Sequence, residues 1–309
     1  TVAQLIKIND ATSGNVVLNP ETIAQDYDDT AANLAAAFDG INTSTAILTI
    51  TADTPAATIA ELVAINAATS GNVVLNAQTI GTAYSDTAAN LAAAFDGIMM
   101  STVTLTIIGG DPATLAELMT INAATSGNVV LNAATIAADL NGSATDLMAA
   151  FDGINTSTGN LTITGTDLAT VAQLIKINGA TSGNVVLNPQ TVATAYSDTA
   201  ANLAAAFNGI TTLTSTLTIT GTTPATVAEL MTINDATIGT VALNTETITA
   251  NLNGSASDLA AAFDGINTST GNLTITGTDP ATVAELIAIN AATSGTVFLN
   301  QQTISANLD

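Results

Sequence analysis

The stretch from residue 58 to residue 98 decides the fold, because it contains two related blocks that recur along the whole chain. The first reads TIAELVAIN at 58–66 and the second reads TAANLAAAFDGI at 87–98. Both contain a hydroxyl residue, an Ala, a Leu, and then Ile or Phe followed by Asn or Asp. We call the units that they open type A and type B. Type A units begin at Thr1, Thr58, Thr114, Thr170, Thr226 and Thr282, and type B units begin at Thr30, Thr87, Ser143, Thr199 and Ser255.

The spacing of these blocks defines a repeat. Successive type A units begin 57, 56, 56, 56 and 56 residues apart, with a type B unit near each midpoint. The 309 residues therefore hold eleven units of about 28 residues, six of type A alternating with five of type B. Because repeat units bury their apolar faces against their neighbours, we expect one continuous array over residues 1–309 without terminal caps.

Each block predicts a short helix that begins at its hydroxyl residue. A Thr followed three residues later by Glu is a capping box, in which each side chain accepts a hydrogen bond from a backbone N–H at the helix start. Apolar residues such as Leu34 and Phe38 then follow at helical spacing. The predicted capping residues are Thr58, Glu61, Thr114, Glu117, Thr226, Glu229, Thr282 and Glu285, with Gln4 and Gln173 in place of Glu in two units.

A short strand follows each predicted helix, reading NVVLN in type A units and LTIT in type B units. In LTIT at 161–164, Leu and Ile face the core and both Thr face solvent, because strand side chains alternate. In the first NVVLN we expect Val17 and Asn19 to face out. The recurring order predicts an α/β fold, namely a repeat solenoid of eleven helix–strand units with a parallel β-sheet and short helices on one side. The alternative is a 56-residue turn with type A and type B strands in separate sheets.

The composition excludes several classes of function. The chain has no Cys and no His, so disulfides, thiol chemistry, Cys/His zinc sites and His-based catalysis are absent. Lys7 and Lys176 are the only basic residues against 25 acidic ones, which gives a net charge of −23. Since nucleic-acid binding depends on Lys and Arg, we expect no nucleic-acid partner. The sequence contains no run of 18 apolar residues, so it predicts no membrane span.

A family resemblance rests on ATVAELIAINAATSGTV at 281–297 and TGNLTITGT at 270–278. These blocks resemble tandem repeats of very large secreted or cell-surface proteins of cyanobacteria and other aquatic bacteria. The resemblance implies an extracellular or cell-surface location, a structural or adhesive role, and no catalytic residues. Some such proteins also carry glycine-rich calcium-binding nonapeptides, a series that this chain lacks.

An Asn or Asp closes every helix block, and we predict that these side chains form a ladder that bonds backbone groups of the neighbouring loops. The Asp members are weak calcium candidates, because calcium needs six to eight oxygen ligands and one Asp per unit supplies too few. We therefore expect no cofactor, with calcium as the alternative. The ladder residues are Asn9, Asp39, Asn66, Asp96, Asn122, Asp152, Asn178, Asn208, Asn234, Asp264 and Asn290, and the calcium candidates are Asp39, Asp96, Asp152 and Asp264.

A regular row of Thr side chains is predicted on the outer face of the sheet. Flat Thr rows resemble ice-binding faces, so a module that binds carbohydrate or ice is the alternative function, although only every second strand offers two Thr. Thr is also a common solvent-facing strand residue. We expect no enzyme, because capping explains the glutamates and the other acids recur as repeat elements. The predicted exposed face comprises Thr49, Thr106, Thr162, Thr164, Thr218, Thr220, Thr274 and Thr276.

The ends of the sequence favour an assembly role. Solenoids normally need terminal units with polar outer faces, whereas this chain opens at a capping residue, Thr1, and ends at Asp309 in the loop before the next helix. Placing Asp309 before Thr1 gives DTVAQL, which is similar to DTAANL at 29–34. We therefore expect a structural repeat protein that continues end to end, either with further repeats of a longer chain or with copies of itself, as an extracellular fibre, filament or adhesive stalk.

Overall fold

The computed structural model of the protein describes residues 1–51, 55–100 and 102–305. Helices and short strands alternate in a recurring order through this part of the chain, which confirms an α/β fold built from repeated helix–strand units. Contacts divide the chain into two compact units, Thr1–Leu140 with Ala149–Gly159, and Asn141–Met148 with Asn160–Asp309. Each compact unit holds several repeats. A single continuous array over residues 1–309 stays a prediction.

A helix opens every repeat unit directly after its predicted hydroxyl residue. The type B helices are shorter than the type A helices, because an Asp-Gly or Asn-Gly pair follows them and the glycine takes a left-handed conformation, with φ 70° at Gly97. The type A helices are α1 (Val2–Asp10), α4 (Ile59–Ala68), α7 (Leu115–Ala124), α10 (Val171–Ala180), α13 (Val227–Ala236) and α16 (Val283–Ala292). The type B helices are α3 (Ala31–Ala37), α6 (Ala88–Phe95), α9 (Ala144–Ala150), α12 (Ala200–Phe207) and α15 (Ala256–Ala262).

The predicted strands are present but shorter than the sequence blocks. The type B strands are β2 (Leu48–Ile50), β5 (Leu105–Ile107), β8 (Leu161–Ile163), β11 (Leu217–Ile219) and β14 (Leu273–Ile275). The type A strands are β3 (Val73–Val74), β6 (Val129–Val130), β9 (Val185–Val186), β12 (Val241–Ala242) and β15 (Val297–Phe298). In the first type A unit, the corresponding residues 16–17 form no strand.

Type A units contain two further elements that the sequence analysis missed, so one helix and one strand per unit is wrong for type A. A short helix follows the NVVLN block, and a three-residue strand precedes the next type B helix. The short helices are α2 (Pro20–Ala24), α5 (Ala77–Ile80), α8 (Ala133–Ile136), α11 (Pro189–Ala193), α14 (Thr245–Thr249) and α17 (Gln301–Ser305). The added strands are β1 (Tyr27–Asp29), β4 (Tyr84–Asp86), β7 (Leu140–Gly142), β10 (Tyr196–Asp198) and β13 (Leu252–Gly254).

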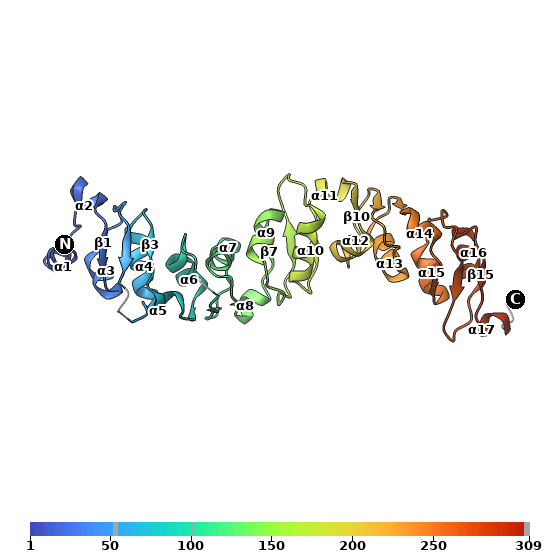
Figure 1. Ribbon diagram of the computed structural model, residues 1–309, viewed down its shortest axis with the longest axis horizontal. Helices are drawn as coiled ribbons and strands as arrows, with labels where there is room; N and C mark the ends of the chain where they lie inside the picture. Colours follow the sequence, from blue (N-terminus) through green and yellow to red (C-terminus); the bar gives the residue numbers. More distant parts are fainter. Residues whose placement is uncertain (52–54, 101, 306–309) are drawn as a thin grey trace. The chain divides into compact units, whose positions relative to one another are not determined.

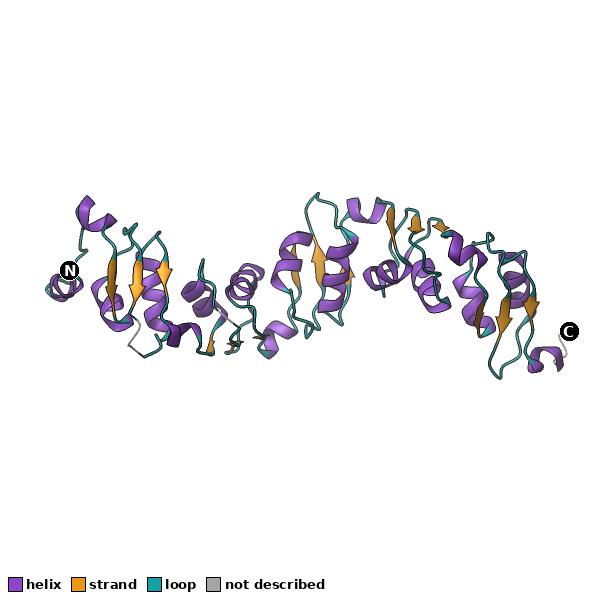
Figure 2. Cartoon of the chain, viewed as in Figure 1, coloured by secondary structure: helices purple, strands orange, loops and turns teal. Residues whose placement is uncertain are grey.

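The strands form separate three-stranded parallel sheets, which corrects the expected single sheet. The described residues form five sheets, in the orders β1-β2-β3, β4-β5-β6, β7-β8-β9, β10-β11-β12 and β13-β14-β15, and Figure 2 shows the strands in such groups. A type A strand ends one sheet, the short helix follows it, and the next added strand starts a new sheet. Type A and type B strands pair within one sheet, with Leu48 opposite Val73, so the alternative with separate sheets is also wrong.

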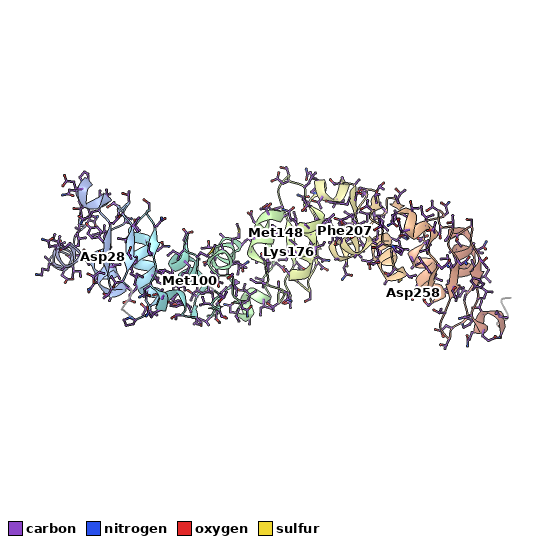
Figure 3. All side chains as sticks on the ribbon, viewed as in Figure 1. Asp28, Met100, Met148, Lys176, Phe207 and Asp258 are labelled. Atoms are coloured by element: carbon purple, nitrogen blue, oxygen red, sulfur yellow. The ribbon has the colours of Figure 1, made fainter. Side chains whose placement is uncertain are left out.

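The core lies between each sheet and the long helices on its inner face. Leu and Ile of each type B strand are buried and the Thr between them is half-buried, as the predicted alternation requires. Figure 1 shows α3 and α4 side by side next to the first sheet. The type B helices add a buried Phe, such as Phe207, which is labelled on α12 in Figure 3. Helix packing against one face leaves the Thr face of each sheet to solvent.

The last Asn of the first NVVLN block, Asn19, is exposed as expected, but this orientation does not hold in every unit. Asn76 and Asn188 are buried, and the Asn at this position caps the short helix that follows it. The backbone leaves the strand before this Asn, so strand alternation no longer sets its direction. Val17 is also exposed as expected.

A tight turn after the type A helix α4 brings neighbouring backbones into close approach. Thr69 Oγ1 accepts a hydrogen bond from the Gly71 N–H at 2.9 Å and donates one to the Ala46 carbonyl at 2.7 Å. A Cβ on Gly71 would overlap the carbonyl oxygens of Thr45 and Ala46. Glycine is therefore required at this position, because there is no room for a side chain.

We expect Gly71→Ala to lower the free energy of unfolding by about 2 kcal/mol or more, because the added Cβ must displace backbone of the preceding unit. Gly110→Ala is the matched control, since a Cβ there meets nothing within 4 Å. Urea-induced unfolding followed by circular dichroism measures both variants. Equal stability of the two variants would contradict the close approach.

Candidate functional site

The Asn residues near the ends of type A helices join each type A unit to the type B unit that follows. Asn66 Nδ2 donates to the Ala93 carbonyl at 3.0 Å and to the Asp96 carbonyl at 3.1 Å. Both carbonyls lie at the end of a type B helix, where carbonyl groups lack N–H partners within the helix. The same pair of bonds is made by Asn9, Asn122, Asn178 and Asn234.

The predicted ladder therefore has two different kinds of member. Its type A members donate through their side-chain amides. Its type B members accept through backbone carbonyl oxygens while their side chains are exposed, and these members are Asp39, Asp96, Asp152, Asn208 and Asp264. Asn290 is exposed and has no type B unit after it in this sequence. The bond runs between successive units, which identifies the side of a type A helix that faces the following unit.

The calcium candidates do not converge. Among residues 1–51, 55–100 and 102–305, no three Asp or Glu side chains lie together in a way that could hold a metal ion. Asp39, Asp96, Asp152 and Asp264 each lie in an exposed turn of a separate repeat. A hollow of about 580 Å³ beside Asn208 brings together Asp235 and Asp264, which supply two carboxylates.

The capping residues take the geometry that the sequence suggests. Thr58 Oγ1 accepts from the Glu61 N–H at 3.3 Å, and Glu61 Oε2 accepts from the Thr58 N–H at 2.7 Å. Capping boxes form at Thr1–Gln4, Thr58–Glu61, Thr114–Glu117, Thr170–Gln173, Thr226–Glu229 and Thr282–Glu285. These carboxylates and amides are therefore engaged in helix starts.

A second hydrogen-bond network, which the sequence analysis missed, uses the Asn-x-x-Thr motif at the start of each short helix. Asn188 Oδ1 accepts from the Thr191 N–H at 2.9 Å, and its Nδ2 donates to the carbonyls of Gly165 and Asp167. Thr191 is fully buried, and its Oγ1 accepts from the Ala169 N–H at 3.2 Å. The signal was visible as a fixed spacing in all six type A units, at Asn19/Thr22, Asn76/Thr79, Asn132/Thr135, Asn188/Thr191, Asn244/Thr247 and Asn300/Thr303.

The outer face of each sheet is mixed in chemistry. In the first sheet Asp28, Thr49 and Val74 lie in one row across the strands, and in the last sheet the row is Asn253, Thr274 and Phe298. The central residues Thr49, Thr106, Thr162, Thr218 and Thr274 are half-buried, whereas Thr164, Thr220 and Thr276 lie just past the strands and are exposed. The Thr residues thus lie in short rows on separate sheets.

Two of the three buried tyrosines, Tyr84 and Tyr196, connect the sheet to the loop before a type A helix. Tyr84 donates to the Ala57 carbonyl at 2.8 Å, and Tyr196 donates to the Ala169 carbonyl at 2.9 Å. Burial raises the pKa of both phenols above the ordinary value of 10.0, because the phenolate would lose its hydration. A type B Phe packs against each ring.

The first and last type A helices expose apolar side chains that interior repeats bury. Ile8 of α1 is 51% exposed, whereas the equivalent Ile65 is fully buried. Val283 of α16 is 47% exposed, whereas the equivalent Ile59 is 9% exposed. Ile287 and Ile304 are also exposed at this end. We call these two surfaces the α1 end surface (Ile8, Ala11) and the α16 end surface (Val283, Leu286, Ile287, Asn290).

Comparison with known proteins adds no further constraint on the function. No protein-family model matches the chain, and no curated protein matches it significantly. Within the described residues, each helix is too short or too polar to serve as a membrane span.

We expect Asn66→Asp to lower the free energy of unfolding by about 2 kcal/mol, because a carboxylate cannot donate to the two carbonyls that Asn66 serves. Asn290→Asp is the matched control, since it places the same charge near the end of an equivalent helix without a bonded neighbour unit. We expect the control to change stability by less than about 0.5 kcal/mol. Equal losses in urea unfolding would show that helix-end charge, and not the inter-repeat bond, causes the effect.

We expect a steep loss of stability above pH 10 that is smaller in the double variant Tyr84→Phe/Tyr196→Phe. Because the folded-state pKa values are raised, the tyrosines contribute full stability below their unfolded pKa and lose it as the pH rises through the folded values. The chain contains three Tyr, and the double variant leaves Tyr27 in place. Unfolding midpoints measured between about pH 9 and 11 test this, and identical pH profiles would refute it.

Proposed function

We propose that this chain is a structural repeat protein of an extracellular fibre, filament or adhesive stalk, in which the helix–strand solenoid continues past the α1 and α16 end surfaces through contact with further repeats. The single observation that supports this most is the exposure of Ile8 and Val283 at positions that interior repeats bury. The further repeats belong either to a longer chain or to a second copy.

The contact pattern supports continuation. In the first compact unit α4 packs against α3 and α6, and in the second α13 packs against α12 and α15, so a type A helix is completed by one neighbour on each side. Each end surface presents one such side without its neighbour. Apolar area of this kind drives association, at roughly 25 cal/mol per Å² removed from water.

The extracellular location and the adhesive role rest on the resemblance to repeats of large secreted and cell-surface proteins. The net charge of −23 suits solubility in salty water, where self-repulsion is screened. The proposal assigns no catalytic residue and needs no calcium. Recognition of carbohydrate or ice by the sheet face gains no support from the mixed rows on separate sheets.

The variant Val283→Asn tests the proposal. We expect the parent chain to associate reversibly as its concentration rises, and Val283→Asn to weaken this association about tenfold, because the variant places an amide in the α16 end surface. Sedimentation velocity over a range of concentrations measures this, and electron micrographs show whether the associated species are linear.

Val186→Asn is the matched control, because Val186 has the same 47% exposure on the outer face of a sheet. We expect it to leave association unchanged. A parent chain that stays monomeric throughout would contradict assembly through the ends. An equal effect of the control would instead favour the sheet face as the binding surface.

A further inference from the structure

We infer that both end surfaces of this chain take a type B repeat unit, and that the opposite end of a second copy does not complete them. This inference rests on the proposed continuation and names the kind of unit that provides it. The six type A and five type B units alternate, so a type A unit stands at both ends of the sequence. Stacking two copies head to tail would therefore bring type A against type A.

The exposed positions show which neighbour each end surface lacks. Ile8 is exposed in α1, but its equivalent Ile289 is buried in α16, so this position faces the preceding unit. Val2 is buried in α1, but its equivalent Val283 is exposed in α16, so this position faces the following unit. In the interior repeats both sides of a type A helix are covered by type B helices, as α3 and α6 cover α4.

The packing of α4 shows what the α16 end surface would contact. Its residues Ile59 and Leu62 are buried between α4 and its neighbours, and Asn66 bonds to the end of α6. The equivalent residues of the last type A helix are Val283, Leu286 and Asn290. The apolar part of this surface can pack against any closely fitting helix, whereas the Asn requires two accessible carbonyls side by side.

The length of the neighbouring helix decides whether those carbonyls lie at a helix end. The type B helix α6 ends at Phe95, so the carbonyls of Ala93 and Asp96 lie at its end and accept from Asn66. The type A helix α4 continues to Ala68, so its carbonyl equivalent to Ala93, that of Ala64, lies within the helix and is used by the helical hydrogen-bond pattern. A type A unit in this place would offer Asn290 one carbonyl that is already used within a helix, and so a weaker pair of acceptors.

The α1 end surface also matches a type B unit, in this case one that would precede α1. Ile65 and Ala68, the interior equivalents of Ile8 and Ala11, are fully buried in a helix that packs against the type B helix α3. Both end surfaces therefore match a type B unit better than they match each other. A chain that began with type A and ended with type B would have complementary ends.

The test extends the full chain by one unit after Asp309. The first extended chain adds a second copy of residues 254–281, which places the type B capping residue Ser255 at the spacing found between units inside the chain. The matched control adds a second copy of residues 225–252, which places the type A capping residue Thr226 at the same point. Both additions are 28 residues long.

We expect backbone amides of α16 to exchange with solvent about tenfold more slowly in the type B extension than in the type A extension, because only the type B unit completes the packing and the Asn290 bonds. The type B extension also has complementary ends, so we expect it to form linear oligomers at a lower concentration than the parent or the type A extension. Circular dichroism checks that both added units are folded.

Equal protection of α16 in the two extensions would overturn the inference. Protection specific to type B without linear oligomers would support the inference and contradict assembly between chains, so the two proposals can fail separately. As a second check, Asn290→Ala should return α16 of the type B extension towards the exchange rates of the type A extension and leave the parent unchanged. No effect of Asn290→Ala in the type B extension would count against the role of the Asn.

Discussion

The constraint on which the structure depends is the supply of hydrogen-bond partners for backbone groups between very short elements. Strands of two or three residues and helices of two to three turns leave many N–H and C=O groups without a regular partner. Asn and Thr side chains meet this need, as Asn66 does for the end of α6 and Thr191 does for the N–H of Ala169. No buried side-chain nitrogen or oxygen in the described part of the chain lacks a partner.

These bonds join each repeat unit to a neighbouring one along the chain. A type A helix donates forward through its Asn to the end of a type B helix. The buried Thr of each short helix after α2 accepts from the loop before its own unit's type A helix. The composition follows from this arrangement, because a chain with few aromatic residues and few charges takes its specificity from amides and hydroxyls. Apolar packing between Leu, Ile and Ala supplies the cohesion.

Much of the fold could be predicted from the sequence, because the repeat, the helix starts and the alternation of LTIT express local rules. The capping boxes, for example Thr58 with Glu61, depend only on residues three apart. The single sheet was wrong because the short helix after Asn76 and the strand at Tyr84 redirect the chain, and each is too short to show a hydrophobic period.

The candidate site was also predicted only in part, because spacing is visible in the sequence and tertiary contacts are not. The ladder positions were found from their regular spacing, but their division into amide donors such as Asn66 and carbonyl acceptors such as Asp96 depends on the different lengths of neighbouring helices, which is a tertiary property. The Asn-x-x-Thr motif was visible as a spacing, but its role depends on a loop that lies 22 residues away in sequence, between Thr191 and Ala169.

Residue-resolved native-state hydrogen exchange of the unmodified chain tests most directly whether neighbouring units hold one another in place. The account predicts that amides of α1 and α16 exchange faster than the equivalent amides of α4 and α13, and that the N–H of Ala169, bonded to Thr191, is protected although it lies in a loop. Equal protection of terminal and interior type A helices, or rapid exchange at Ala169, would contradict it.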